Sequence, residues 1–303
     1  MRKSSKPKVI AVVGPTATGK TSLAVTLAEH FAGEIISADS RQVYRGLDIG
    51  TAKVTPEEKR GVPHHLIDIT DIDTIYTAAD FVRDADQAIE HINSQGHLPI
   101  VAGGTFFYVE LLRRTMHPAP VPPNHALRAE LEAYSTEQLF TLLQEKDAQR
   151  AATVDPYNRR RVMRSLEIID ALGTVPPTPT ETSSPYDFCL LGITRDKTIP
   201  RERFAIRARE WLRAGLVAEV EGLLARGVSR ARLQEIGFEY TLVLELIDGT
   251  LTPDTFTQRF VEKNWQYAKR QLTWLQRDPT ITWIDPDDTN QAMSIVSAFL
   301  SPE

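Results

Sequence analysis

The chain has 303 residues, of which 42% are hydrophobic and 25% are charged. These values exclude a low-complexity or disordered chain and leave room for one large core or a core with an insertion. The formal net charge of −5 argues against a general nucleic-acid coat protein, and the single cysteine, Cys189, excludes a disulfide framework and a cysteine-based zinc site. No stretch approaches the ~18 apolar residues of a membrane span, so we expect a cytoplasmic protein without membrane contact.

The first part of the chain alternates strand and helix patterns. A continuous β-branched run, Lys8 to Val13, predicts a strand buried on both faces of a parallel sheet. Further strands are predicted at Glu34 to Ser37 and Leu98 to Ala102, with helices at Thr21 to Phe31 and Ala78 to Asn93. This alternation predicts a parallel α/β sheet with right-handed crossovers.

The middle of the chain shows helical patterns at Leu127 to Leu142 and Arg159 to Leu172, with no strand pattern between them. A proline-rich stretch, His117 to Pro123, precedes them, and a loop rich in Pro, Thr and Ser, Gly173 to Pro185, follows. We therefore predict an all-helical insertion over residues 114–184 and a core domain formed by residues 1–113 and 185–303.

The strand pattern returns after this insertion, at Phe188 to Ile193. Helices are then predicted at Arg201 to Arg226, from about Glu239, and at Pro253 to Arg277. An edge strand at Thr280 to Ile284 and a helix at Asn290 to Leu300 complete the predicted elements.

A phosphate-binding motif follows the first predicted strand. Its residues match G-x-x-x-x-G-K-[ST] and are Gly14, Pro15, Thr16, Ala17, Thr18, Gly19, Lys20 and Thr21. Loop amides and the helix N-terminus point positive charge at an anion, Lys20 reaches its outer oxygens, and Thr21 offers a hydroxyl to Mg²⁺. The alternative is a helix start with a chance glycine turn. The motif predicts a magnesium-bound diphosphate or triphosphate, and an α/β fold with a P-loop NTPase-like parallel sheet flanked by helices and an inserted all-helical subdomain.

A carboxylate follows the second predicted strand. Asp39 lies in Ser37-Ala-Asp-Ser-Arg-Gln-Val-Tyr44, just past the strand end, where ligands bind in open α/β sheets. It could ligate magnesium through water, act as a general base, or cap the following turn. These alternatives stay open from the residues alone, because a P-loop kinase or NTPase would hold phosphate in the same way.

Six further segments carry a family resemblance: Arg45-Gly-Leu-Asp-Ile-Gly-Thr-Ala-Lys53, Val62-Pro-His-His-Leu-Ile-Asp-Ile69, Gly103-Gly-Thr-Phe-Phe-Tyr108, Asp155-Pro-Tyr-Asn-Arg-Arg-Arg-Val-Met-Arg-Ser-Leu-Glu167, Ile236-Gly-Phe238 and Tyr267-Ala-Lys-Arg-Gln-Leu-Thr-Trp-Leu275. Together they closely resemble the tRNA dimethylallyltransferases over nearly the whole chain. One departure is Glu239, since the family usually has a basic residue after this turn. The departure weakens an RNA-phosphate role for the turn and leaves the catalytic positions unaffected.

The resemblance implies a prenyl transfer. The P-loop would hold the diphosphate of dimethylallyl diphosphate as a leaving group, with Mg²⁺ on Thr21 as cofactor. N6 of adenosine 37, next to the anticodon of tRNAs reading codons that start with U, would attack C1 of the allyl chain, giving N6-(dimethylallyl)adenosine and diphosphate. The implied catalytic residues are Lys20, Thr21, Arg207 and, as general base, Asp39. Arg203 is an alternative to Arg207, and a surface charge is the other interpretation of both.

The resemblance also implies binding of a tRNA anticodon stem-loop, with the target base taken out of its stack. The implied tRNA contacts are Asp39, Ser40, Arg41, Gln42, Thr105, Arg128, Arg160, Arg161, Val162, Met163 and Arg164. We expect a monomer.

Three other functions remain open: a P-loop kinase for a small molecule or nucleoside, an adenylate isopentenyltransferase that acts on free AMP or ATP, and a non-catalytic RNA-binding module. The helical insertion with Arg159 to Arg164 favours tRNA over a free nucleotide, and intact Lys20, Thr21 and Asp39 argue against a non-catalytic module.

Overall fold

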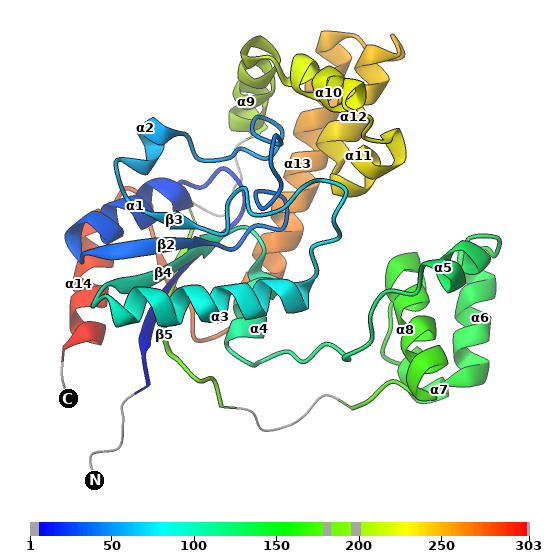
Figure 1. The fold of residues 1–303 in the computed structure, drawn as a ribbon, viewed down its shortest axis with the longest axis horizontal. Helices are drawn as coiled ribbons and strands as arrows, with labels where there is room; N and C mark the ends of the chain where they lie inside the picture. The colour runs from blue at the N-terminus through cyan, green and yellow to red at the C-terminus, as the bar shows by residue number, and fades with distance from the viewer. Residues whose placement is uncertain (1–5, 178–182, 195–200, 302–303) are drawn as a thin grey trace. The chain divides into compact units, whose positions relative to one another are not determined.

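The structure is a computed structural model that describes residues 6–177, 183–194 and 201–301. The chain divides into two compact units (Figure 1), Met1–Thr115 with Ser183–Glu303, and Met116–Thr182. We call the first the core unit and the second the helical lobe, and describe each by itself.

A six-stranded parallel sheet forms the centre of the core unit. Its strands are β1 (Lys8–Val13), β2 (Gly33–Ser37), β3 (His64–His65), β4 (Leu98–Gly103), β5 (Asp187–Ile193) and β6 (Thr282–Ile284), in the order β3-β2-β4-β1-β5-β6. The predicted P-loop-like α/β fold is confirmed. Since every strand runs the same way, all carboxyl ends meet at one edge, where α/β proteins bind ligands. Strand β3 was missed, because two residues carry no periodic signal.

Helices cover both faces of this sheet (Figure 1). The alternation of β1 sends Ile10 and Val12 to one face, where α1 (Lys20–His30) and α14 (Thr289–Leu300) pack. It sends Val9 and Ala11 to the other face, against α3 (Ala78–Ser94) and α4 (Phe106–Leu112). Burial on both sides explains why the residues from Val9 to Val13 are all apolar. The sheet is thereby fixed as the rigid support for the loops at its edge.

Five helices lie between β5 and β6 in the sequence: α9 (Arg201–Ala214), α10 (Leu216–Ala225), α11 (Arg230–Ile236), α12 (Phe238–Ile247) and α13 (Pro253–Leu275). A separate core joins Phe204, Phe256 and Phe260 to Val43 and Leu47 of the loop after β2. The helix predicted over Arg201 to Arg226 is two helices, because Gly215 at φ 100° turns the backbone left-handed. The loop after β2 is thus packed against the C-terminal helices.

The helical lobe has its own core. Helices α5 (His125–Leu131), α6 (Thr136–Lys146), α7 (Ala148–Ala151) and α8 (Arg159–Leu172) pack through Leu139, Leu143, Val162 and Leu166. The single helix predicted over Leu127 to Leu142 is interrupted, because Ser135 and Gln138 form a capping box that starts α6. Helix α8 has the predicted bounds.

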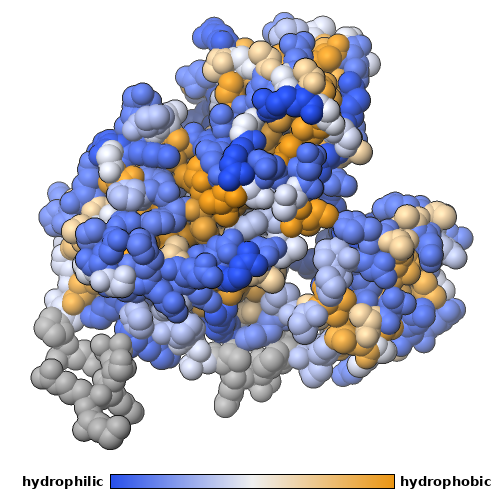
Figure 2. All heavy atoms as spheres, viewed as in Figure 1, coloured by the Kyte–Doolittle hydropathy of each residue, from blue (hydrophilic) through white to orange (hydrophobic). Residues whose placement is uncertain are grey.

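Among the described residues, no helix is both long and apolar enough to cross a membrane. The face of each unit visible in Figure 2 is mainly hydrophilic, with smaller groups of apolar residues between the polar ones. Most of the large apolar side chains are buried within the core unit or within the helical lobe.

Candidate functional site

The P-loop lies between β1 and α1, where three residues shape its backbone. A Cβ at Gly14 would lie 2.7 Å from the carbonyl oxygen of Ile193, so only glycine fits there. Gly19 caps α1 with φ 97°, and Ala17 is left-handed at φ 64°. A non-glycine residue in this conformation costs about 1–2 kcal/mol, and such strain is concentrated at functional sites. The loop is therefore held in a specific shape rather than in a relaxed turn.

Three cations converge on this loop. Lys20 donates from Nζ to the carbonyl oxygen of Pro15 at 2.6 Å, Arg207 from Nη1 to Thr16 Oγ1 at 3.3 Å, and Arg203 from Nη1 to the carbonyl oxygen of Ala17 at 3.1 Å. Burial, reinforced by the positive charge of Arg207, lowers the pKa of Lys20 to about 8, although the carboxylate of Asp39 opposes the shift. Burial also lowers the pKa of Arg207. Two partly desolvated cations this close favour binding of a multivalent anion between them.

Asp39 begins the turn after β2. Its Oδ1 accepts hydrogen bonds from the backbone N–H groups of Arg41 at 2.9 Å and Gln42 at 3.4 Å. One carboxylate oxygen of Asp39 thus caps the turn, as one of the three interpretations from the sequence expected. The same side chain lines a pocket with Lys20 and Arg207, so capping and a chemical role are compatible.

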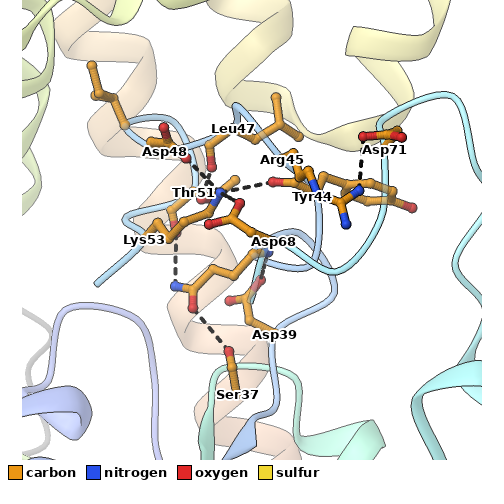
Figure 3. A network of polar contacts seen from close by, with 12 residues as sticks. Ser37, Asp39, Tyr44, Arg45, Leu47, Asp48, Thr51, Lys53, Asp68 and Asp71 are labelled. Atoms are coloured by element: carbon orange, nitrogen blue, oxygen red, sulfur yellow. Dashed lines mark hydrogen bonds and ion pairs between the residues drawn. The ribbon is translucent and has the colours of Figure 1, made fainter. Parts of the chain in front are cut away.

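A polar network behind Asp39 fixes the loop that follows it (Figure 3). Gln42 accepts from Ser37 Oγ at 3.0 Å and donates to the carbonyl oxygen of Ala52 at 3.1 Å. Lys53 Nζ, on a side chain only 7% exposed, donates to Asp48 Oδ1 at 2.6 Å and to the carbonyl oxygen of Tyr44 at 2.9 Å. The amide of Gln42, predicted to contact tRNA, is therefore also a structural tie within the protein.

The turn after β4 lies against the Asp39 loop. A Cβ at Gly103 would lie 2.1 Å from the carbonyl oxygen of Ala38, which explains the glycine. The N–H of Thr105 donates to the same oxygen at 3.1 Å, and Thr105 Oγ1 accepts from the N–H of Ser40 at 3.4 Å. The two segments predicted to meet the substrate nucleotide are thus hydrogen-bonded to each other.

The pocket at this edge has a volume of about 300 Å³ and joins the P-loop, Asp39 and Arg207. Its other wall was not predicted from the sequence: Trp211, Glu239, Asn264, Tyr267 and Gln271, all from the C-terminal helices. Tyr267 shares α13 with Phe256, Phe260 and Trp274, four aromatic residues whose pattern in the sequence indicates a buried stripe. Only Phe256 and Phe260 of that pattern are fully buried, and a helix of 23 residues can cover both a core and a pocket.

Arg41 and Glu239 form an ion pair at the back of this pocket. Arg41 Nη1 lies 2.7 Å from Glu239 Oε2, and the side chains are 23% and 3% exposed. Burial acts to lower the pKa of Arg41, but the carboxylates of Glu239 and Asp39 outweigh it and raise that pKa. The acidic residue that departs from the family pattern therefore has a partner in the Asp39 loop, and the guanidinium of Arg41 is turned toward it.

The residues of the helical lobe that were predicted to contact tRNA differ in exposure. Arg160 and Arg161 are exposed, and within the described part of the chain their side chains have no hydrogen bond or ion pair. Val162 and Met163 are 0% and 7% exposed in the lobe core, so their side chains do not reach the surface, which argues against side-chain contacts of these two residues with tRNA. An α-helix completes one turn in 3.6 residues, so the five consecutive residues Arg160 to Arg164 cannot all face one partner.

The other two lobe arginines that were predicted to contact tRNA are already paired. Arg128 donates from Nε to Glu167 Oε1 at 2.7 Å, and Arg164 donates from Nη1 to Glu167 Oε2 at 3.2 Å. Glu167 is fully buried on its side chain, and the two arginines hold its pKa low against the effect of burial. These arginines therefore neutralise a buried carboxylate within the lobe, whether or not they also contact RNA.

A parallel sheet with a P-loop at the end of its central strand and a pocket at the carboxyl edge defines a P-loop α/β protein. The model of the IPP transferase family matches residues 42–278. The chain belongs to this family.

Named relatives agree over nearly the full length. The chain is 39% identical to a tRNA dimethylallyltransferase of Halalkalibacterium halodurans, with 94% of this chain and 93% of that one aligned. It is 42% identical to a tRNA dimethylallyltransferase of Thermomicrobium roseum, covering 93% and 87%.

Solved structures of relatives share the fold. The full-length tRNA isopentenylpyrophosphate transferase from Bacillus halodurans is similar with a TM-score of 0.71 and 36% identity, over 97% of this chain and 96% of that one. A eukaryotic dimethylallyltransferase acting on tRNA gives a TM-score of 0.75 and 26% identity, over 97% and 77%.

Proposed function

We propose that this protein is a tRNA prenyltransferase that moves a dimethylallyl group from dimethylallyl diphosphate to N6 of adenosine 37 in tRNA. The observation that carries the proposal is one pocket in which a P-loop with three nearby cations faces the carboxylate of Asp39. An anion cradle alone would suit a kinase equally well. Membership of the IPP transferase family does not favour the kinase or a free-nucleotide prenyltransferase.

The leaving group is the diphosphate. As the N6–C1 bond forms and the C1–O bond breaks, the electron pair of C1–O passes to diphosphate. Lys20 and Arg207, with the loop amides and the N-terminus of α1, stabilise the charge that develops there. The low pKa of Lys20 follows from burial and Arg207, and a bound diphosphate would favour its protonated form.

Asp39 is the proposed general base. The exocyclic amine becomes acidic as it is alkylated, and a carboxylate within hydrogen-bond reach can accept its proton. Oδ1 of Asp39 is occupied by the N–H groups of Arg41 and Gln42, which fixes the orientation of the carboxyl group. The N6 proton would therefore go to Oδ2.

Mg²⁺ fits this donor set. Among the described residues, no group of three or more His, Cys, Asp or Glu side chains could hold a metal ion by itself. Mg²⁺ usually keeps several waters and binds through substrate phosphates and one or two protein oxygens, so the hydroxyl of Thr21 on the pocket wall suffices. When bound, the ion would add positive charge at the departing diphosphate.

The acceptor is proposed to be a tRNA anticodon stem-loop bound by a monomer of the protein. Ser40, Arg41 and Thr105 lie beside Asp39 and would position the extruded adenosine. Arg160 and Arg161 of the helical lobe are exposed and would meet backbone phosphates. Such local contacts account for RNA binding by a chain with a formal net charge of −5.

The test is nucleoside analysis of unmodified tRNA after incubation with the protein, dimethylallyl diphosphate and magnesium. Mass spectrometry should find N6-(dimethylallyl)adenosine in the anticodon loop and diphosphate in equal amount. Parallel reactions contain labelled ATP with candidate nucleosides, or free AMP with the prenyl donor. Phosphoryl transfer without tRNA prenylation, or prenylation of free AMP at the tRNA rate, would overturn the proposal.

A further inference from the structure

We propose that Gln271 is a positioning residue that fixes the distance between the diphosphate cradle and the acceptor side of the pocket. This inference rests on the proposed prenyl transfer. It adds to that reaction a residue that touches no reacting atom and acts through two backbone segments.

The geometry of Gln271 joins the two sides directly. On helix α13, its Oε1 accepts from the N–H of Thr16 in the P-loop at 3.0 Å, and its Nε2 donates to the carbonyl oxygen of Gly104 at 2.8 Å. Gly104 immediately precedes Thr105, which is hydrogen-bonded to the Asp39 loop. One side chain therefore connects the leaving-group cradle to the turn that would carry the nucleophile.

Its surroundings make this connection stiff. Gln271 is 9% exposed, on a helix whose neighbouring side chains Ala268 and Leu275 are buried in the core unit. Both ends of the amide are used, and a buried amide that loses a partner is costly. Among neutral side chains of this length, only a carboxamide both accepts and donates at one end.

The approach of Gly104 is equally specific. A Cβ at this position would lie 3.1 Å from Nε2 of Gln271, which is a tight contact, and nothing about the backbone angle of Gly104 prevents alanine. The absence of a side chain therefore serves the contact with Gln271.

Such a tie matters for this reaction because displacement at C1 needs the nucleophile, the carbon and the leaving oxygen in line. A displacement of about 1 Å far from the reacting atoms can lower the rate of the chemical step about 10²-fold. Loss of Gln271 should therefore reduce kcat while leaving the binding of each substrate almost unchanged, since the groups that bind them remain.

The experiment compares Gln271→Met, Gln271→Glu and Gly104→Ala with the wild type and with Gln266→Met. Gln266 is a matched control, because it is an exposed glutamine of the same helix whose side chain, among the residues that the structure describes, bonds only to Glu262. Steady-state kcat and KM are measured separately for dimethylallyl diphosphate and tRNA, and thermal unfolding checks that each variant is folded.

We expect Gln271→Met to lower kcat about 10–100-fold with both KM values within about threefold, in line with a positional defect. Gln271→Glu keeps the acceptor for Thr16 but adds a negative charge beside the anion cradle, so the KM of the prenyl donor should rise as well. Gly104→Ala should lower kcat, and in a Gln271→Met background it should add less than about twofold, because the contact is already lost.

The positioning role would be refuted by a folded Gln271→Met with wild-type kcat, or by a defect that Gln266→Met shares. It would equally be refuted if Gly104→Ala multiplied the loss in the double variant. Failure of the proposed function is separate, since it would appear as no prenylated tRNA from the wild type in the same assay.

Discussion

The ion pair between Arg41 and Glu239 gives a quantitative prediction about stability. Glu239→Leu removes the carboxylate and leaves the guanidinium of Arg41 without its partner. Removing one member of a buried pair costs about 3–5 kcal/mol, and the 23% exposure of Arg41 lowers our expectation to about 2–3 kcal/mol. At about 2–4 °C per kcal/mol for a domain of this size, the Tm of the core unit should fall by about 4–12 °C.

Differential scanning calorimetry at neutral pH measures this change, and a double-mutant cycle isolates the pair. Arg41→Met with Glu239→Leu leaves no lone charge, so the double variant should regain most of the stability that Glu239→Leu loses. The matched control is Asp71→Ala, which breaks the exposed Arg45–Asp71 pair and should cost at most about 1 kcal/mol. Additive losses in the cycle would show that the two charges are not coupled and refute the reasoning.

Three predictions concern the site itself. Asp39→Asn keeps an Oδ1 acceptor for the N–H groups of Arg41 and Gln42, but the amide cannot take a proton. We therefore expect kcat to fall about 10²-fold or more while the affinity for tRNA is kept. An unchanged kcat would show that Asp39 is not the general base. The pKa of Lys20 is about 8 in the free protein, and a bound diphosphate favours its charged form, so diphosphate binding at about pH 8.5 should be accompanied by proton uptake. Calorimetry in two buffers of different ionisation enthalpy measures this uptake, which should be smaller in Lys20→Arg, because the titration of diphosphate itself is common to both proteins. Equal uptake by the two proteins would contradict the assignment of the proton to Lys20. Arg160→Ala with Arg161→Ala should lower the salt dependence of tRNA binding by about 0.7–0.9 per lost phosphate contact, and an unchanged slope would make them ordinary surface charges.

The predicted elements differ in how well sequence signals define them. The run Lys8 to Val13 is a strand because continuous β-branched residues suit burial on both faces, and Arg159 to Leu172 is a helix because its apolar period is unambiguous. The break at Gly215 was missed, since a glycine inside an apolar helical pattern is often tolerated, and only packing against the rest of the core unit decides the matter.

The pocket was only half predictable for a related reason. The P-loop and Asp39 carry local signals, a motif and a strand end, and both lie at the predicted edge of the sheet. Gln271 lies in one of the resemblance segments, but neither it nor Asn264 carries a local signal of a pocket residue, because both occupy one face of a long helix whose other residues have the pattern of a core. Val162 and Met163 show the reverse case: the resemblance implies RNA contact along the whole stretch, although helical periodicity already indicates that part of it faces inward.

Strand order explains why the two halves of the reaction meet. The sheet places β4 between β2 and β1, although β4 comes later in the sequence than both. Adjacent strands lie about 4.8 Å apart, so the Asp39 loop after β2 and the P-loop after β1 start roughly 10 Å from each other, with the Gly104–Thr105 turn between them. That interval accommodates a transferred carbon and the atoms bonded to it, and the missing side chains of Gly103 and Gly104 let Ala38 and Gln271 pack closely against the turn. A kinase with the same P-loop needs only the anion cradle and its acceptor. Here the middle strand supplies a second backbone surface, and two hydrogen bonds of Gln271 join it to the cradle. The role that we propose for Gln271 is to keep the separation of the two constant.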